Sequence, residues 1–109
     1  MPSSPRKPIY SVHEDDPELQ EPINDFVIGL AERIDLLQDL HSTGEFVRLG
    51  ELCEETAVEA DRLGYPLMAT VARVAAEACK ENKADASEEA LVELTELGQR
   101  IRQAHRGAA

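Results

Sequence analysis

Apolar side chains recur three and four positions apart along four stretches of the chain. The first stretch has them at Leu19, Ile23, Phe26, Val27, Leu30, Ile34 and Leu37, and the second at Phe46, Leu49, Leu52, Cys53, Thr56, Ala60 and Leu63. The fourth has them at Leu91, Leu94, Leu97 and Ile101, with Gly98 beside them. This spacing matches the 3.6-residue period of the α-helix and places the side chains on one face. The sequence therefore predicts amphipathic helices.

The third stretch has a wider apolar face than the others. Leu67, Val71, Val74 and Ala78 form its stripe, and Met68, Ala72, Ala75 and Cys79 broaden it. A wide apolar face is typical of a helix that is contacted on two sides. Four such helices joined by short connections predict an all-α fold, an antiparallel up-down four-helix bundle.

Start and stop signals give the expected boundaries. The first helix is expected to open at an Asp16 cap, with Pro17 in its first turn and Pro22 shortly after, and the second at a Ser42–Glu45 capping box, with Gly64 as its stop. The third is expected to start at Pro66 and to end near Asn82, and the fourth to be capped by Asp85 and Glu88 and to end at Gly107. Residues 1–16 hold three prolines and the acidic run 14–16, a composition that does not build a core. We therefore expect a flexible leader over 1–16 and the bundle over 17–107.

Composition excludes several classes of function. The 109 residues suffice for one core, and no apolar run of about 18 residues is present to cross a membrane. The formal charge of −11 repels phosphate backbones and anionic lipid, and with no Trp, two Tyr and two Phe there is little to stack on bases. The start of the chain lacks the apolar segment of a secretory signal. We expect a cytoplasmic protein with no nucleic-acid or membrane partner.

The sequence also lacks the residue patterns of a metal site or of a cysteine nucleophile. Cys53 and Cys79 share no zinc spacing, and they are expected to be reduced, buried thiols. Carboxylate-rich bundles hold metals through Glu-x-x-His pairs, but Tyr10, Gln38 and Arg102 stand three before the histidines at 13, 41 and 105. No metal and no cofactor is expected.

Two helices carry aliphatic side chains on their outward faces. At about 100° per residue, the outer side of the second helix presents Val47, Glu51, Glu54, Val58, Asp61 and Arg62, with Gly50 one turn before Glu54. The outer side of the first helix is a row of carboxylates that contains Ile28. Isolated surface aliphatics are normal. If the two helices adjoin, however, Ile28, Val47 and Val58 would form a small acid-rimmed apolar patch, which is typical of a transient protein-binding surface.

The second helix and the turn after it resemble the histidine-containing phosphotransfer domains of two-component phosphorelays. Phe46, Leu49, Leu52, Cys53 and Ala60 fit the apolar frame of that family, and Leu63-Gly64-Tyr65-Pro66 fits its turn into the third helix. In the family an exposed histidine carries the phosphoryl group, with a basic residue three positions later and a glycine four positions later. Here Glu54, Ala57 and Val58 occupy those positions. A carboxylate is a poor substitute for the imidazole nucleophile, and an acyl phosphate would lack a compensating cation.

The resemblance implies a degenerate, non-catalytic member of that family. Its partner would be the receiver domain of a response regulator or a histidine kinase. The implied partner-binding residues are Ile28, Val47, Gly50, Glu51, Glu54, Ala57, Val58, Asp61 and Arg62, with Glu54 at the phosphoacceptor position. Two alternatives stay open: an active relay protein that uses another histidine, with His41 the best of the three, and a bundle that pairs with itself through Val47 and Val58.

Overall fold

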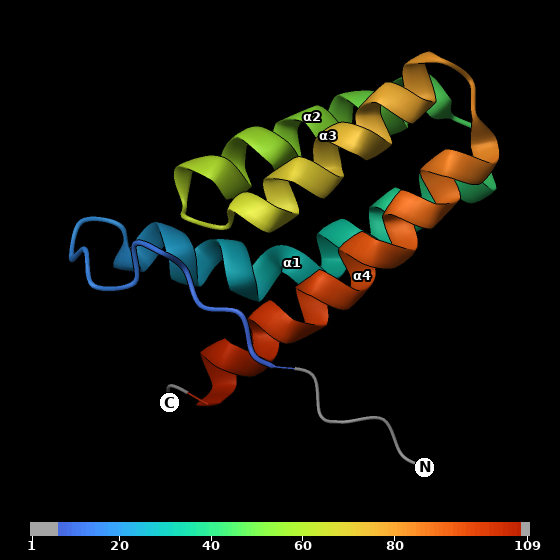
Figure 1. The fold of residues 1–109 in the computed structure, drawn as a ribbon. Coiled ribbons are helices and arrows are strands. Elements are labelled where there is room, and N and C mark those ends of the chain that lie inside the picture. Colours follow the sequence, from blue (N-terminus) through green and yellow to red (C-terminus); the bar gives the residue numbers. More distant parts are fainter. Residues whose placement is uncertain (1–6, 108–109) are drawn as a thin grey trace, which may run out of the picture.

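A computed structural model describes residues 7–107 and contains four helices. They are α1 (Gln20–Ser42), α2 (Phe46–Arg62), α3 (Pro66–Lys80) and α4 (Ala84–Gly107). Each helix packs on its neighbours in the chain, and α4 also packs on α1, so the four close a ring in chain order. In Figure 1, α2 and α3 lie side by side above the layer formed by α1 and α4. The predicted all-α antiparallel bundle is confirmed.

The core is formed by the predicted apolar stripes of α1, α2 and α4. Its largest fully buried side chains are Leu30, Leu37, Leu49, Leu63, Met68, Leu94 and Ile101. In α3 the prediction is partly wrong, because Leu67 and Val74 are 50% and 55% exposed. Alanines replace them in the core, where Ala69, Ala72 and Ala76 are buried. The large side chains Leu67 and Val74 lie on an exposed edge of α3, whereas several of its alanines lie on the buried face.

The small residues let α2 and α3 approach closely. A Cβ atom added at Gly50 would lie 3.3 Å from the Cβ of Cys79, which is tighter than an ordinary contact. Ala57 and Ala60 of α2 are also buried, at 1% and 0% exposure. Close packing at this seam therefore fixes which side of α2 faces outward.

Three predicted helix starts are wrong. Asp85 does not cap α4, because the helix begins at Ala84 and Asp85 lies inside its first turn. Asp16 does not cap α1, because its side chain accepts a hydrogen bond from the Glu18 amide at 2.9 Å in a preceding turn and the helix begins at Gln20. Ser42 is the last residue of α1, so there is no Ser42–Glu45 capping box. Instead the Thr43 hydroxyl donates to Glu45 at 2.7 Å in the connection. Local spacing signals cannot tell the end of one helix from the start of the next when the connection is this short.

Residues 7–16 lie against the bundle and are not a free leader; we call this segment the strap. The Ile9 amide donates to the Arg100 carbonyl at 3.1 Å, and the Val12 amide donates to the Gly64 carbonyl at 2.9 Å. Ser11 is buried and its hydroxyl donates to the Leu63 carbonyl. Backbone hydrogen bonds to two distant elements hold the strap, so the predicted flexibility does not apply to these residues. Residues 1–6 of the predicted leader lie outside the described residues.

Candidate functional site

The outer face of α2 is exposed as its helical phase requires. Val47 is 78% exposed and Val58 is 64% exposed, and Glu51, Glu54 and Asp61 are exposed between and beside them. The spacing from 47 to 54 to 58 follows two turns and then one turn of helix, so the three side chains share one ridge. The sequence prediction of an acidic ridge with two exposed valines is confirmed for this helix.

Glu54 borders a shallow groove along the seam between α2 and α3. The groove encloses about 280 Å³ and is lined by Phe46, Val47, Gly50, Glu51, Glu54, Cys79, Lys80 and Asn82. Lys80, the last residue of α3, brings a cation into the same groove as Glu54. Sequence reasoning missed Lys80 because it looked for a basic residue on α2 itself. The antiparallel order of the helices could have predicted it, because that order places the end of α3 beside the start of α2.

The thiol next to Glu54 is unreactive. Burial, with smaller contributions from Cys79 and the Glu54 charge, raises the pKa of Cys53 to about 12. Burial also raises the pKa of Cys79. Both cysteines are free and buried. Since the thiolate is the reactive form, neither sulfur supplies a nucleophile to this face at neutral pH.

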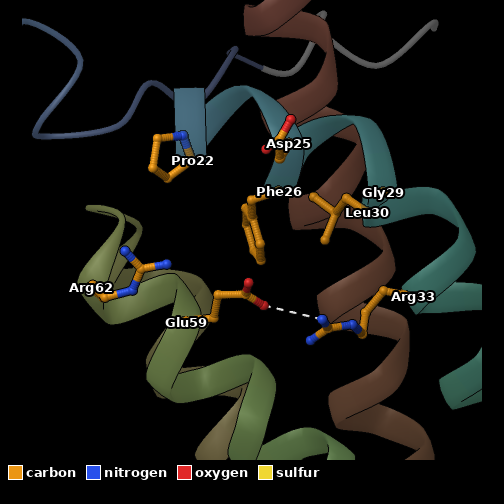
Figure 2. A pocket seen from close by; sticks show the side chains of 8 residues that line it. All are labelled: Pro22, Asp25, Phe26, Gly29, Leu30, Arg33, Glu59 and Arg62. Carbon is orange, nitrogen blue, oxygen red and sulfur yellow. Dashed lines mark hydrogen bonds and ion pairs between the residues drawn. The ribbon is translucent and has the colours of Figure 1, made fainter. Parts of the chain in front are cut away.

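A cleft of about 310 Å³ separates the outer faces of α1 and α2 (Figure 2). Its lining is Pro22, Asp25, Phe26, Gly29, Leu30, Arg33, Glu59 and Arg62. Arg33 crosses the cleft and donates to Thr56 at 2.9 Å and to Glu59 at 3.1 Å. This bridge connects α1 with α2, and the Arg62 guanidinium lies free of hydrogen bonds and ion pairs to other described residues.

The cleft lies between the two helices that carry the predicted apolar patch. Ile28 of α1 is 68% exposed and Val58 of α2 is 64% exposed. Asp25, Arg33, Glu59 and Arg62 are among the residues that line the cleft between the helices. The two valines share the ridge of α2, and the joining of Ile28 to them stays a prediction.

Two of the predicted contact residues, Gly50 and Ala57, are buried. Ala57 is 1% exposed and Gly50 is buried, because both face α3 across the close seam. Neither residue offers an exposed side chain to a partner, although Gly50 is one of the residues that line the groove. Asp61 is exposed and lies 3.7 Å from Arg73 of α3. The exposed ridge thus consists of Val47, Glu51, Glu54 and Val58, with Asp61 and Arg62 at its end.

None of the three histidines stands on the outer face of α2, although His41 packs on Phe46, which lines the same groove as Glu54. His41 is held at the end of α1, where its Nε2 lies 3.2 Å from the Ala84 carbonyl oxygen and its ring packs edge-on against Phe46 at 5.6 Å. His13 belongs to the strap and His105 to the last turns of α4. Within residues 7–107 there is no group of three metal-ligating side chains that could hold an ion. In the same range no helix is long and apolar enough to cross a membrane.

The fold and the ridge define the class of the protein. It is an up-down four-helix bundle that presents one acidic, valine-containing helix face to its surroundings. Comparison of the chain with protein-family profiles, with curated proteins and with solved structures found no match.

Proposed function

We propose that the protein is a non-catalytic phosphotransfer-like domain that binds the receiver domain of a response regulator through the outer face of α2. The observation that carries this proposal is the position of Glu54. It stands at the centre of an exposed ridge, between Val47 and Val58, where an active relative would present its phosphoacceptor histidine.

The surroundings of Glu54 agree with the proposal. The turn after α2 has the form expected from the resemblance, because Leu63 is fully buried, Gly64 has φ of +89°, and Pro66 opens α3. A small apolar ridge rimmed by charge is the surface of a transient complex, since exposed carboxylates steer the approach of a partner while the aliphatic side chains supply burial. No histidine stands on α2, which favours a ridge that binds a partner over one that carries a phosphoryl group.

The mechanism that follows is competition. The domain occupies a receiver surface that an active phosphotransfer protein also needs, and it neither donates nor accepts a phosphoryl group there. Binding through one helix face of this size is expected to be weak and rapidly reversible, because few side chains take part.

The test compares two valines that are equally exposed on opposite sides of the bundle. Val58 of α2 is 64% exposed and Val92 of α4 is 65% exposed, and α2 and α4 make no close backbone contact. Immobilised wild-type protein, Val58→Glu and Val92→Glu are used to capture proteins from the native cell lysate. Captured proteins are identified by mass spectrometry, and purified receivers among them are then titrated.

Receiver-containing proteins should bind wild type and Val92→Glu and be lost with Val58→Glu. Failure to enrich any receiver, or equal binding by the two variants, would remove this function. Acid-labile phosphate on His13, His41 or His105 after mixing with a phosphorylated receiver would support the active relay instead. A concentration-dependent mass in sedimentation that only Val58→Glu abolishes would support self-association.

A further inference from the structure

A second cavity lies at the opposite end of α1 from the α1–α2 connection. It encloses about 660 Å³ between the strap, the first turns of α1 and the last turns of α4. Figure 1 shows the strap, in blue, passing near these two helix ends. Its lining is Ile9, Tyr10, Ser11, Glu14, Pro17, Gln20, Glu21, Ile23, Asn24, Tyr65, Ile101, Ala104 and His105. None of these residues belongs to the α2 ridge, and the volume is in the range of small-molecule sites, about 300–1,000 Å³.

The inner wall of this cavity is apolar and fixed. Ile101 and Ala104 of α4 are 1% and 3% exposed, and Ile23 of α1 is 9% exposed. Tyr65 is 5% exposed and its ring stacks on Phe26 with the centroids 5.8 Å apart. These side chains are held by the core of the bundle, so the wall exists before any ligand arrives. Tyr10 stands at the edge and is 53% exposed.

The outer wall of the cavity is negatively charged. Glu14 of the strap and Glu21 of α1 both line it; within the described part of the chain His105 of α4 is the one basic side chain in the lining, and no lysine or arginine lines the cavity. The Glu14 charge is close enough to Tyr65 to add to burial in raising the pKa of the tyrosine. The strap positions Glu14, because its amide donates to the Ser11 carbonyl at 3.2 Å and its carbonyl accepts from Gln20 at 3.5 Å. Both carboxylates are free of ion pairs to other described residues.

We propose that this cavity binds a small organic cation, a primary amine carried on an aromatic or branched apolar body. The apolar body would lie against Ile23, Ile101 and the Tyr65 ring. The ammonium would lie between Glu14 and Glu21, where the face of Tyr10 adds a cation–π contact. An anion is disfavoured by the two carboxylates, and a neutral apolar molecule gains nothing from them. This site is independent of receiver binding.

The test titrates the labelled protein with three probes of the same shape and different charge. Phenethylammonium is the cation, 2-phenylethanol the neutral probe and 3-phenylpropionate the anion, followed by amide and methyl NMR signals at neutral pH and low salt. The cation should cause saturable shifts at Tyr10, Tyr65 and Ile101. It should bind roughly tenfold more tightly than the neutral probe, since each partly screened ion pair changes affinity by up to about fivefold. The anion should bind least.

Conservative variants separate the two carboxylates from a general effect of charge. Glu14→Gln and Glu21→Gln should each weaken cation binding by about two- to fivefold, and together they should remove the preference over 2-phenylethanol. Glu18→Gln is the control, because Glu18 is exposed nearby but does not line the cavity. If Glu14→Gln loosens the strap, seen as lost protection of the Val12 amide, Glu21→Gln decides the question. Equal binding of cation and neutral probe, shifts confined to other parts of the protein, or no saturable shift would overturn the proposal.

Discussion

Gly64 provides the sharpest test of how the strap is attached. Its φ is +89°, a conformation that costs an L-residue about 1–2 kcal/mol. A Cβ atom at this position would also collide with the Ser11 hydroxyl and with the backbone of His13. Gly64→Ala therefore has two costs, one from the backbone angle and one from the strap.

Gly44 is the matched control. Its φ is +74°, but a Cβ atom added there would meet nothing within 4 Å. Gly44→Ala should cost only the angle, about 1–2 kcal/mol of unfolding free energy. Gly64→Ala should lose in addition the hydrogen bonds that Ser11 and Val12 make to the α2–α3 turn, about 1 kcal/mol each, for a total of about 3–4 kcal/mol. The gain from a stiffer unfolded chain is shared by both variants and cancels in the difference.

The assay is urea unfolding followed by helical circular dichroism, together with hydrogen exchange at the Val12 amide. The difference between the two variants should be about 2 kcal/mol. Val12 should lose protection in Gly64→Ala and keep it in Gly44→Ala. Equal destabilisation with Val12 still protected in both would show that the strap accommodates the added Cβ atom and does not pack as closely on Gly64 as argued from the Ser11 contact.

Four further outcomes are expected. Thr56→Val should lower the free energy of unfolding in urea by about 1–2 kcal/mol, because Arg33 loses a hydrogen-bond acceptor. Thr70→Val should change it little, because the Thr70 hydroxyl bonds only within its own helix. Equal losses of unfolding free energy in the two variants would contradict the Arg33 bridge. Gly29→Ala should stabilise by about 0.5–1 kcal/mol, since its Cβ meets nothing, and Gly98→Ala should destabilise by collision with Ile34. With its pKa raised to about 12, Cys53 should react with a thiol reagent at pH 8 only as fast as the protein unfolds. Because the unfolded chain loses the Cys53 proton above its ordinary pKa of about 8.5 while the folded chain keeps it, the stability that the buried thiol contributes is present below that pH and is lost as pH rises towards 12. A urea midpoint that stays constant above pH 9 would contradict the burial of Cys53. Glu54→His should gain no phosphate from a phosphorylated receiver, measured as acid-labile label, because Ala57 and Val58 remain. Transfer by this single variant would show that the residues at 57 and 58 do not limit phosphotransfer.

Helical phase was enough to predict the fold and the outer ridge. The positions of Val47, Glu54 and Val58 follow from 100° per residue once Leu49 and Cys53 are placed in the core. The strap was not predictable in this way, because two of its attachments are backbone hydrogen bonds to Arg100 and Gly64, and backbone groups leave no pattern in a sequence. Proline content and acidity indicated a segment without helix, which is correct for residues 7–16, but they do not report whether such a segment is held.

The joint patch of Ile28, Val47 and Val58 stays a prediction for a different reason. Phase places a side chain on the outward half of its own helix, but it does not state how far apart two neighbouring helices stand. The cleft that Arg33 and Glu59 bridge lies between α1 and α2, and its presence depends on tertiary packing. Lys80 illustrates the same limit, since only the antiparallel pairing of α2 with α3 brings it beside Glu54.

Positions 54 and 57 differ in burial, and this difference decides which residues of the phosphotransfer pattern the bundle could accept. Glu54 and Val58 are exposed, so histidine and glycine there would leave the core unchanged. Ala57 is 1% exposed against α3, in a seam that already brings Gly50 within a tight contact of Cys79. A lysine at 57 would have to push this seam apart or extend its ammonium past it, and burying that charge without a partner costs several kcal/mol. Placing a histidine at 54, a lysine at 57 and a glycine at 58 together, as the phosphotransfer pattern would require, therefore needs a wider spacing of α2 and α3 than this packing has.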